Sequence, residues 1–238
     1  MKFENYILSS WQENAAQWVE TIEQTKIPSR EFTNPALIDC IKNQIQKSVL
    51  EFGFGEGWLG RSLMKEDYSV FGLDGTQALV TAAKQKSDTQ NYALATFQKI
   101  VNRANSEIQS KTLDQIQIQQ FHGAVFNFCL YEKEGISEIL KSVSKLISTE
   151  RKIIIQTIHP KSMLAMELPH RSQWVEDSWQ GLNGNFKNGH PWYFRTLEDW
   201  LSIFEFSKLQ VEKIYEPLGK ETDRPVSIIF VLRNASNQ

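Results

Sequence analysis

The sequence has little of what several classes of protein require. Only two of its 238 residues are cysteine, Cys40 and Cys129, and neither has a CxxC partner, so we expect neither a metal site nor a disulfide framework. The formal net charge is −2, from 26 basic and 28 acidic residues, which disfavours a nucleic-acid binder. No apolar run reaches about 18 residues, which disfavours a membrane span. The polar start lacks the apolar core of a secretory signal, so a cytoplasmic protein is expected.

An amphipathic helix is predicted at the N-terminus. Its apolar residues recur at spacings of three and four, and they are Phe3, Ile7, Trp11, Ala15, Trp18 and Ile22. Such a face either packs on the rest of the domain or closes over a bound ligand as a lid. A segment between Pro28 and Pro35 separates this helix from a second one predicted over residues 35–46.

Strands and helices alternate through the middle of the chain. The predicted strands span residues 48–53, 68–74, 92–97, 122–131 and 152–158, and the predicted helices span residues 58–65, 76–86 and 136–147. Strands that are apolar throughout and alternate with helices indicate a parallel sheet covered on both faces. A polar, Gln-rich stretch at 106–120 carries no clear prediction.

The C-terminal part has a different pattern. Thr196 and Asp199 form a capping-box arrangement ahead of an apolar helix. Residues 209–216 and 226–232 are strands joined by a turn too short for a crossover helix, so the last strand should run antiparallel. The predicted fold class is a three-layer α/β sandwich with a mostly parallel, seven-stranded sheet and an antiparallel C-terminal hairpin strand.

The stretch VLEFGFGEGWLG at 49–60 ends a strand in closely spaced glycines. Gly55, Gly57 and Gly60 match GxGxxG, the pattern of a dinucleotide site. Asp74, 19 residues after Gly55, has the spacing of the acid that holds a ribose. Glu51 argues against a pyrophosphate, because an ionised carboxylate at the strand end would repel it in a low dielectric. It favours a ligand with an ammonium and a sulfonium, such as S-adenosylmethionine. A third interpretation is a tight structural corner.

At these residues the chain resembles a known family. Glu51, Gly53, Gly55 and Gly57 resemble the first motif, (D/E)xGxGxG, of class I S-adenosylmethionine-dependent methyltransferases. The resemblance covers roughly residues 45–235 and implies a Rossmann-like fold in which the terminal antiparallel hairpin is a family trait. It implies that Glu51 helps hold the methionine end of the cofactor. It also implies that Asp74 accepts hydrogen bonds from both ribose hydroxyls.

One further stretch extends the resemblance, and another departs from it. HGAVFNFCLYE at 122–132 is similar to the fourth-strand motif beside the transferred methyl group. The family often has an acid after the third strand that holds the adenine amino group, but here ALATFQKI has none. The resulting candidates for cofactor binding are Glu51, Gly53, Phe54, Gly55, Gly57, Asp74, Gly75, Thr96, Phe97, Asn127 and Phe128.

The methyl acceptor should lie near residues 159–195, because ligands of open α/β sheets bind outside the carboxyl ends of the strands. His159 ends a strand and is either a general base or a structural histidine. The candidates for substrate binding come from an aromatic and cationic cluster, in which an arginine could pair with a carboxylate, and they are Arg171, His190, Trp192 and Tyr193. A base is not essential, because the sulfonium is already a strong electrophile and alignment supplies much of the acceleration.

The leading functional hypothesis is a methyltransferase that uses S-adenosylmethionine and acts on oxygen or nitrogen of a small molecule. Alternatives are a non-catalytic S-adenosylmethionine-binding regulatory or scaffold protein and an NAD-dependent oxidoreductase. Nucleic-acid methylation is disfavoured by the charge and by the absence of a (D/N)PP(Y/F) motif. We expect one domain in four parts: an N-terminal helical cap over 1–46, a cofactor-binding half over 47–158, a substrate-lid insertion over 159–195, and a C-terminal helix and hairpin over 196–238.

Overall fold

Seven strands form one sheet in the computed structural model, which describes residues 2–87, 91–105, 121–147, 152–162, 168–220 and 224–235. The order across the sheet is β3-β2-β1-β4-β5-β9-β8. Its strands are β1 (Ser48–Phe52), β2 (Ser69–Asp74), β3 (Tyr92–Leu94), β4 (Gly123–Asn127), β5 (Lys152–Thr157), β8 (Leu209–Tyr215) and β9 (Ile228–Asn234). The first five pair in parallel, and β9 runs antiparallel to both β5 and β8. The predicted fold class is therefore confirmed, including the antiparallel terminal strand.

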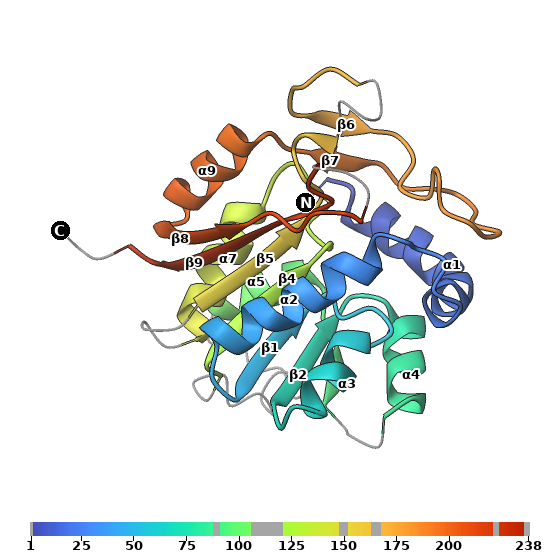
Figure 1. The fold of residues 1–238 in the computed structure, drawn as a ribbon, viewed down its shortest axis with the longest axis horizontal. Coiled ribbons are helices and arrows are strands. Elements are labelled where there is room, and N and C mark those ends of the chain that lie inside the picture. Colours follow the sequence, from blue (N-terminus) through green and yellow to red (C-terminus); the bar gives the residue numbers. More distant parts are fainter. Residues whose placement is uncertain are drawn as a thin grey trace.

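Helices cover both faces of this sheet (Figure 1). The described helices are α1 (Glu4–Glu23), α2 (Arg30–Gln44), α3 (Trp58–Met64), α4 (Gln77–Gln85), α5 (Phe97–Asn105), α7 (Ile136–Leu146) and α9 (Leu197–Phe206). Alternate residues of β1 face opposite sides, with Val49 in the core under α2 and α3, and Leu50 in the core under α5, α7 and α9. Both cores consist of buried apolar side chains, whose removal from water stabilises the sandwich.

The helix and strand boundaries differ from the predicted ones at three places. Helix α2 begins at Arg30 and contains Pro35, whereas the prediction started a helix at that proline. Strand β3 ends at Leu94, and the next helix begins at Phe97. Strand β4 ends at Asn127, because Phe128 takes a positive φ of 49° that breaks the strand. The Gln-rich stretch at 106–120 lies outside the described residues.

The segment without clear periodicity contains a short ribbon that the sequence did not predict. Strands β6 (Gln173–Val175) and β7 (Trp192–Phe194) pair antiparallel as a separate two-stranded sheet. The predicted helix after Thr196 is present, and the Thr196 hydroxyl accepts a hydrogen bond from the Asp199 N–H at 3.3 Å. The sequence prediction there is confirmed.

Helix α1 joins this ribbon at the end of the sheet where the parallel strands finish (Figure 1). Asn14, 2 % exposed, donates to the Lys187 carbonyl at 2.7 Å and accepts from the Lys187 N–H at 2.8 Å. Ser10 donates to the Asn188 carbonyl and accepts from the indole N–H of Trp179. We call α1 and residues 173–194 together the cover. Helix α2 belongs instead to the helix layer on the sheet, so the predicted cap over 1–46 separates into two parts with different positions.

No helix among the described residues has the length and apolar character that crossing a membrane would need.

Candidate cofactor and acceptor site

One large cavity of about 840 Å³ lies between the cover and the carboxyl ends of β1, β2, β4 and β5. Small-molecule sites typically measure roughly 300–1,000 Å³, so this one has room for a sizeable ligand and a second small molecule. The strand order reverses between β1 and β4: the chain adds β2 and β3 on one side of β1, and then β4 and β5 on the other side. This is the switch point at which open α/β sheets bind their ligands.

The glycine turn, residues 53–57, forms the floor of the cavity. Gly53, Gly55 and Gly57 have φ of +64°, +63° and +82°, a conformation that L side chains rarely adopt. A Cβ atom on Gly53 would stand 2.5 Å from the Cβ of Cys129, so only glycine fits there. Gly55 is different, because a Cβ there would meet only the indole Nε1 of Trp18, at 3.6 Å. The backbone at Gly55 is therefore open to a ligand lying beneath α1.

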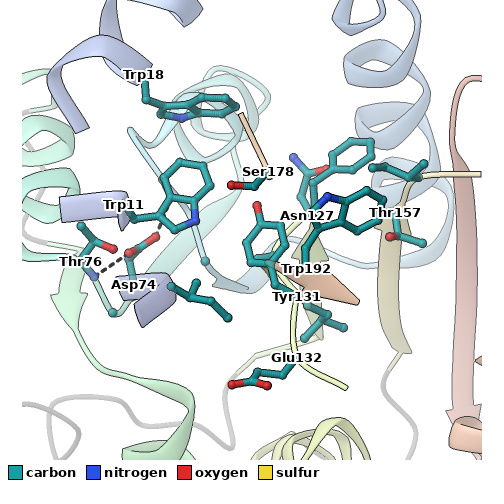
Figure 2. A pocket seen from close by; sticks show the side chains of 18 of the residues that line it. Trp11, Trp18, Asp74, Thr76, Asn127, Tyr131, Glu132, Thr157, Ser178 and Trp192 are labelled. Carbon is teal, nitrogen blue, oxygen red and sulfur yellow. Dashed lines mark hydrogen bonds between the residues drawn. The ribbon is translucent and has the colours of Figure 1, made fainter. Parts of the chain in front are cut away.

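Asp74 ends β2 beside this turn. Its Oδ2 accepts from the Gly55 N–H at 2.9 Å and its Oδ1 accepts from the Thr76 N–H at 2.8 Å. Burial raises the pKa of the Asp74 carboxyl to about 6, although the bonds from Gly55 and Thr76 favour its ionised form. The group is ionised at neutral pH, and each oxygen keeps a further lone pair for a ligand. Figure 2 shows it at the cavity wall with the bond to Thr76.

Glu51 lies under the turn and is 1 % exposed. Burial raises the pKa of the Glu51 carboxyl to about 8, and the charges of Asp74 and Glu56 act in the same direction. Its Oε2 is buried without a hydrogen-bond partner. The sequence interpretation treated Glu51 as ionised, but at pH 7 burial keeps the proton on. Its repulsion of a pyrophosphate is therefore weaker than expected.

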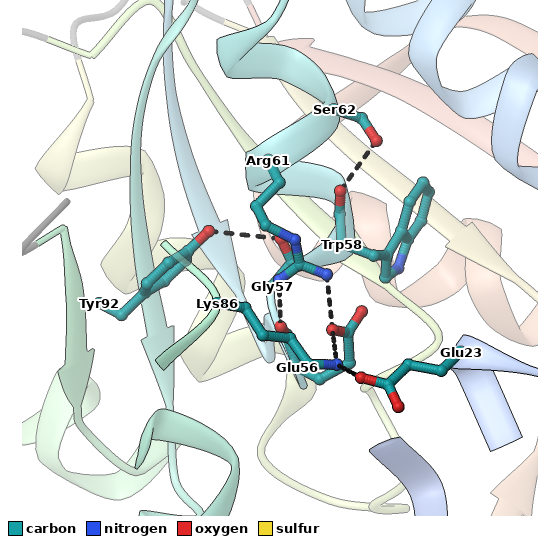
Figure 3. Close-up of polar contacts among 8 residues, drawn as sticks. All are labelled: Glu23, Glu56, Gly57, Trp58, Arg61, Ser62, Lys86 and Tyr92. Carbon is teal, nitrogen blue, oxygen red and sulfur yellow. Dashed lines mark hydrogen bonds and ion pairs between the residues drawn. The ribbon is translucent and has the colours of Figure 1, made fainter. Parts of the chain in front are cut away.

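Two further polar atoms without hydrogen-bond partners lie where α2 meets the turn. Glu56 is fully buried, and its Oε2 contacts Arg61 at 2.6 Å and Lys86 at 3.0 Å (Figure 3). Its Oε1 has no partner. Arg30, whose guanidinium lies 4.8 Å over the Trp58 ring, has a buried Nη2 without a partner. Burial lowers the pKa of Arg30 to about 10, so the group remains charged at neutral pH. Both side chains line the cavity.

Helix α1 covers the other side of the turn. Trp18 lies above Gly55, and the Leu8 side chain fills the place where a Cβ on Gly75 would be, 2.5 Å away. Glu4 accepts from the backbone N–H of Gln98 at 3.2 Å. This bond brings a carboxylate beside Thr96 and Phe97, where the sequence has no acid of its own after the third strand. All three α1 residues line the cavity.

The remaining wall is aromatic, with a few buried polar atoms. The ring centroids of Trp11 and Tyr131 lie 6.1 Å apart, and Figure 2 shows them with Trp192 around the same space. Asn127 Oδ1 and Ser178 Oγ are buried here without a hydrogen-bond partner. Unpaired buried groups of this kind cost about 1–3 kcal/mol each, so a ligand that pairs with them gains affinity.

Most of the predicted cofactor residues lie around this one cavity. Ten of the eleven line it: Glu51, Gly53, Phe54, Gly55, Asp74, Gly75, Thr96, Phe97, Asn127 and Phe128. Gly57 is not in the described lining, because the place of its side chain is taken by Tyr92, whose hydroxyl would be 3.0 Å from a Cβ. Its glycine is needed for the turn into α3. That these residues bind a cofactor stays a prediction.

The predicted catalytic and substrate residues divide differently. Trp192 and Tyr193 line the cavity, but His159, Arg171 and His190 are not in its described lining. His159 Nδ1 accepts from the Lys161 N–H at 3.0 Å, so its Nε2–H donates to Glu216 at 2.8 Å. With both nitrogens used, the geometry speaks against His159 as a base. His190 is fully buried behind Tyr131, 4.9 Å between ring centroids, and Arg171 is exposed.

Several cavity residues escaped the sequence reasoning. Arg30 and Glu56 give no motif, although Glu56 is one residue from Gly55. Ser178 lies in a segment without periodicity. Arg195 belongs to the aromatic and cationic cluster seen in the sequence but was not among the substrate candidates. It is Arg195, and not Arg171, that is buried in the wall, and its Nη2 donates to the carbonyl oxygens of Glu132 and Lys133.

Comparison with known proteins places the fold. Neither a known family profile nor a curated protein sequence matches this chain. Its structure nevertheless has the fold of the class I S-adenosylmethionine-dependent methyltransferases. It is similar to a methyltransferase from Leishmania major, with a TM-score of 0.68 at 12 % identity over 97 % of this chain and 83 % of that one.

Two further structures of that class resemble it. One is the 1,6-didemethyltoxoflavin N1-methyltransferase of Burkholderia thailandensis, with bound 1,6-didemethyltoxoflavin and S-adenosylhomocysteine, at a TM-score of 0.66 and 10 % identity over 99 % of this chain and 90 % of that one. The other is a putative methyltransferase of Haloferax volcanii in complex with the Trm112 methyltransferase activator. Its TM-score is 0.66 at 12 % identity over 98 % of this chain and 99 % of that one.

Proposed function

We propose that this protein is an S-adenosylmethionine-dependent methyltransferase that transfers the methyl group to oxygen or nitrogen of a small molecule. The observation that carries this proposal is the pairing of Asp74 with the open backbone at Gly55 in a cavity at the switch point. The toxoflavin enzyme, which shares the fold, is an N-methyltransferase crystallised with a small heterocycle. In the proposal the cavity holds both cofactor and acceptor.

The unsatisfied polar atoms fit the ends of this cofactor. Glu51 Oε2 and Glu56 Oε1 are buried acceptors suited to the ammonium of the methionine part, and Arg30 Nη2 is a buried donor suited to its carboxylate. Asp74 would accept from the ribose hydroxyls. Glu4, contributed by α1, would replace the acid that is missing after the third strand and accept from the adenine amino group. When bound, the cofactor supplies an electrophilic methyl group on a sulfonium.

The chain's own residues then have a positioning role. The cover excludes water from the reacting atoms, and Asn127 at the end of β4 fixes the acceptor beside the turn. With His159 facing Glu216, no base is assigned. Alignment of the nucleophile is the main source of acceleration in this proposal.

Calorimetric titration with S-adenosylhomocysteine, with NAD as a parallel ligand, tests the cofactor assignment. We expect micromolar binding of the first and none of the second. Arg30→Gln and Glu4→Ala should each weaken S-adenosylhomocysteine about 10-fold or more, because a hydrogen bond to a charged group is worth about 1.5–3 kcal/mol. Exposed Arg171→Gln is the matched control and should bind normally. NAD binding would favour the oxidoreductase alternative, and binding without turnover on any acceptor would favour the scaffold alternative.

A further inference from the structure

The part of the cavity under the cover is built from aromatic rings. Trp11 makes an edge contact with Trp179 at 4.6 Å between centroids and approaches Tyr131 at 6.1 Å. Trp192 lines the same space (Figure 2). We call these four residues the aromatic chamber. Flat ring faces of this kind favour flat aromatic ligands over bulky aliphatic ones, because stacked and edge contacts need planar partners.

Three polar atoms beside the aromatic chamber can accept hydrogen bonds from a ligand. Asn127 Oδ1, Ser178 Oγ and Glu132 Oε2 are buried without partners. An amide oxygen can only accept, an ionised carboxylate oxygen likewise only accepts, and the Ser178 hydroxyl can accept or donate. Glu132 holds the backbone N–H of Phe3 with its other oxygen. A ligand that presents two N–H groups would satisfy two of these atoms at once, whereas a single hydroxyl would satisfy one.

The charges around the cavity disfavour an anionic acceptor. Arg30 and Arg195 are the basic residues in its described lining, against Glu4, Glu56, Asp74, Glu132 and Asp177, whereas Glu51, also in the lining, keeps its proton at neutral pH. Arg195 is 2 % exposed, donates to the Glu132 and Lys133 carbonyls, and faces Asp199 at 3.9 Å. Its guanidinium stacks on Tyr193 and Trp200. The positive charge at this end is therefore paired with Asp199, although the Arg195 Nε–H has no hydrogen-bond partner.

We propose that the methyl acceptor is a planar aromatic amine or N–H heterocycle, held between the rings of the aromatic chamber with its N–H groups on Asn127 and Ser178. This inference rests on the proposed function and narrows it from oxygen or nitrogen to nitrogen. An aromatic amine is neutral at pH 7, keeps a lone pair while donating N–H bonds, and needs no prior deprotonation. That matches a wall in which neither His159 nor His190 is in the described lining.

The transfer balances without a further reagent. The nitrogen lone pair forms the new bond to the methyl carbon, and the carbon–sulfur bond breaks with its electron pair left on sulfur. The positive charge passes from sulfur to nitrogen. When the product leaves the cavity, its methylated nitrogen loses one N–H proton to solvent, and the final products are an N-methylamine and a neutral thioether.

Four matched probes test the proposal: 6-aminoquinoline, 6-hydroxyquinoline, quinoline-6-carboxylate and cyclohexylamine. Each is titrated into the protein saturated with S-adenosylhomocysteine, with tryptophan fluorescence as the binding signal, and then incubated with S-adenosylmethionine for detection of methylated product by mass spectrometry. We expect 6-aminoquinoline to bind about 10-fold tighter than 6-hydroxyquinoline, a difference of one neutral hydrogen bond, and to be the methylated probe. The carboxylate and the aliphatic amine should bind still more weakly.

Two serine variants test whether Ser178 binds the amine probe. Ser178→Ala should weaken 6-aminoquinoline several-fold and leave S-adenosylhomocysteine binding unchanged, whereas Ser202→Ala on the exposed side of α9 should change neither. Tighter or equal binding of 6-hydroxyquinoline, the carboxylate or cyclohexylamine would overturn the proposal, and so would binding of none of the four to the S-adenosylhomocysteine complex. Failure of S-adenosylhomocysteine itself to bind is a different result, because it removes the proposed function and the acceptor assignment with it.

Discussion

The glycine turn and the cover line the same cavity but are held in place by different kinds of contact. In the turn, the bond that positions Asp74 links it to Gly55, only 19 residues away. In the cover, Asn14 bonds the backbone of Lys187 across 173 residues. Backbone stereochemistry over a few residues shapes the turn, whereas side chains from distant segments assemble the cover. The turn can therefore be predicted from the sequence, whereas the cover cannot.

The largest effect should come from placing a side chain in the turn. Gly53→Ala combines a positive φ, which costs about 1–2 kcal/mol, with a Cβ 2.5 Å from that of Cys129, and overpacking costs roughly 1–3 kcal/mol more. Urea unfolding should show the sum. Gly181 in the cover has a φ of +82°, but a new Cβ there would have nothing within 4 Å. Gly181→Ala should therefore lose only the stability that the positive φ costs. Equal losses would mean that the Cys129 contact is easily relieved.

Next in size is the loss of the ribose acceptor. Asp74→Ala should weaken S-adenosylhomocysteine roughly 100-fold, because it removes charged hydrogen bonds worth about 1.5–3 kcal/mol each. Calorimetry measures this directly, with exposed Asp39→Ala on α2 as the control. Because the Gly55 and Thr76 N–H groups also lose their acceptor, the far-UV circular dichroism spectrum of the variant is compared with that of the parent protein to show that the fold is retained. Unaltered affinity would contradict the assignment of the acid that ends β2.

A smaller and more local effect is expected in the cover. Asn14→Ala removes the two bonds to Lys187 and exposes that backbone, at a cost of about 1–3 kcal/mol. Hydrogen exchange should quicken in residues 185–190 while β1 and β4 stay protected. The exposed Asn43→Ala on α2 should leave both unchanged. Equal acceleration in β1 would show that the cover and the sheet unfold together, which would remove the distinction between the two regions.

The last effect depends on pH and concerns the buried acid under the turn. The folded pKa of Glu51, about 8, lies above its unfolded value, so the unfolded chain binds fewer protons between about pH 4.5 and 8 and stability falls with rising pH. Glu51→Gln removes this loss. It should raise the Tm at pH 8 by about 2–4 °C for each kcal/mol regained, and change it little at pH 4.5. A gain equal at both pH values would show a packing effect instead.

Much of the fold was predictable because its signals are local. Apolar runs identified the parallel strands, the short connection before residue 226 made β9 antiparallel, and Thr196 with Asp199 marked the start of α9. The failures have physical reasons as well. His159 lies two residues beyond the end of β5, and its side chain turns to Glu216 on a distant segment. A proline at 35 suggested a helix start, although α2 begins at Arg30, with Thr33 buried ahead of the proline.

The sequence by itself determined the fold class and the position of the turn and its acids, because strand periodicity, positive φ at glycine and short spacings act within a few dozen residues. Only the tertiary structure decided which polar groups are left without partners, that Glu51 keeps its proton at neutral pH, and that α1 carries Glu4 to the third strand. Burial, pKa and hydrogen-bond satisfaction depend on everything that packs around a group. No local pattern encodes them, and they are the properties on which acceptor choice depends.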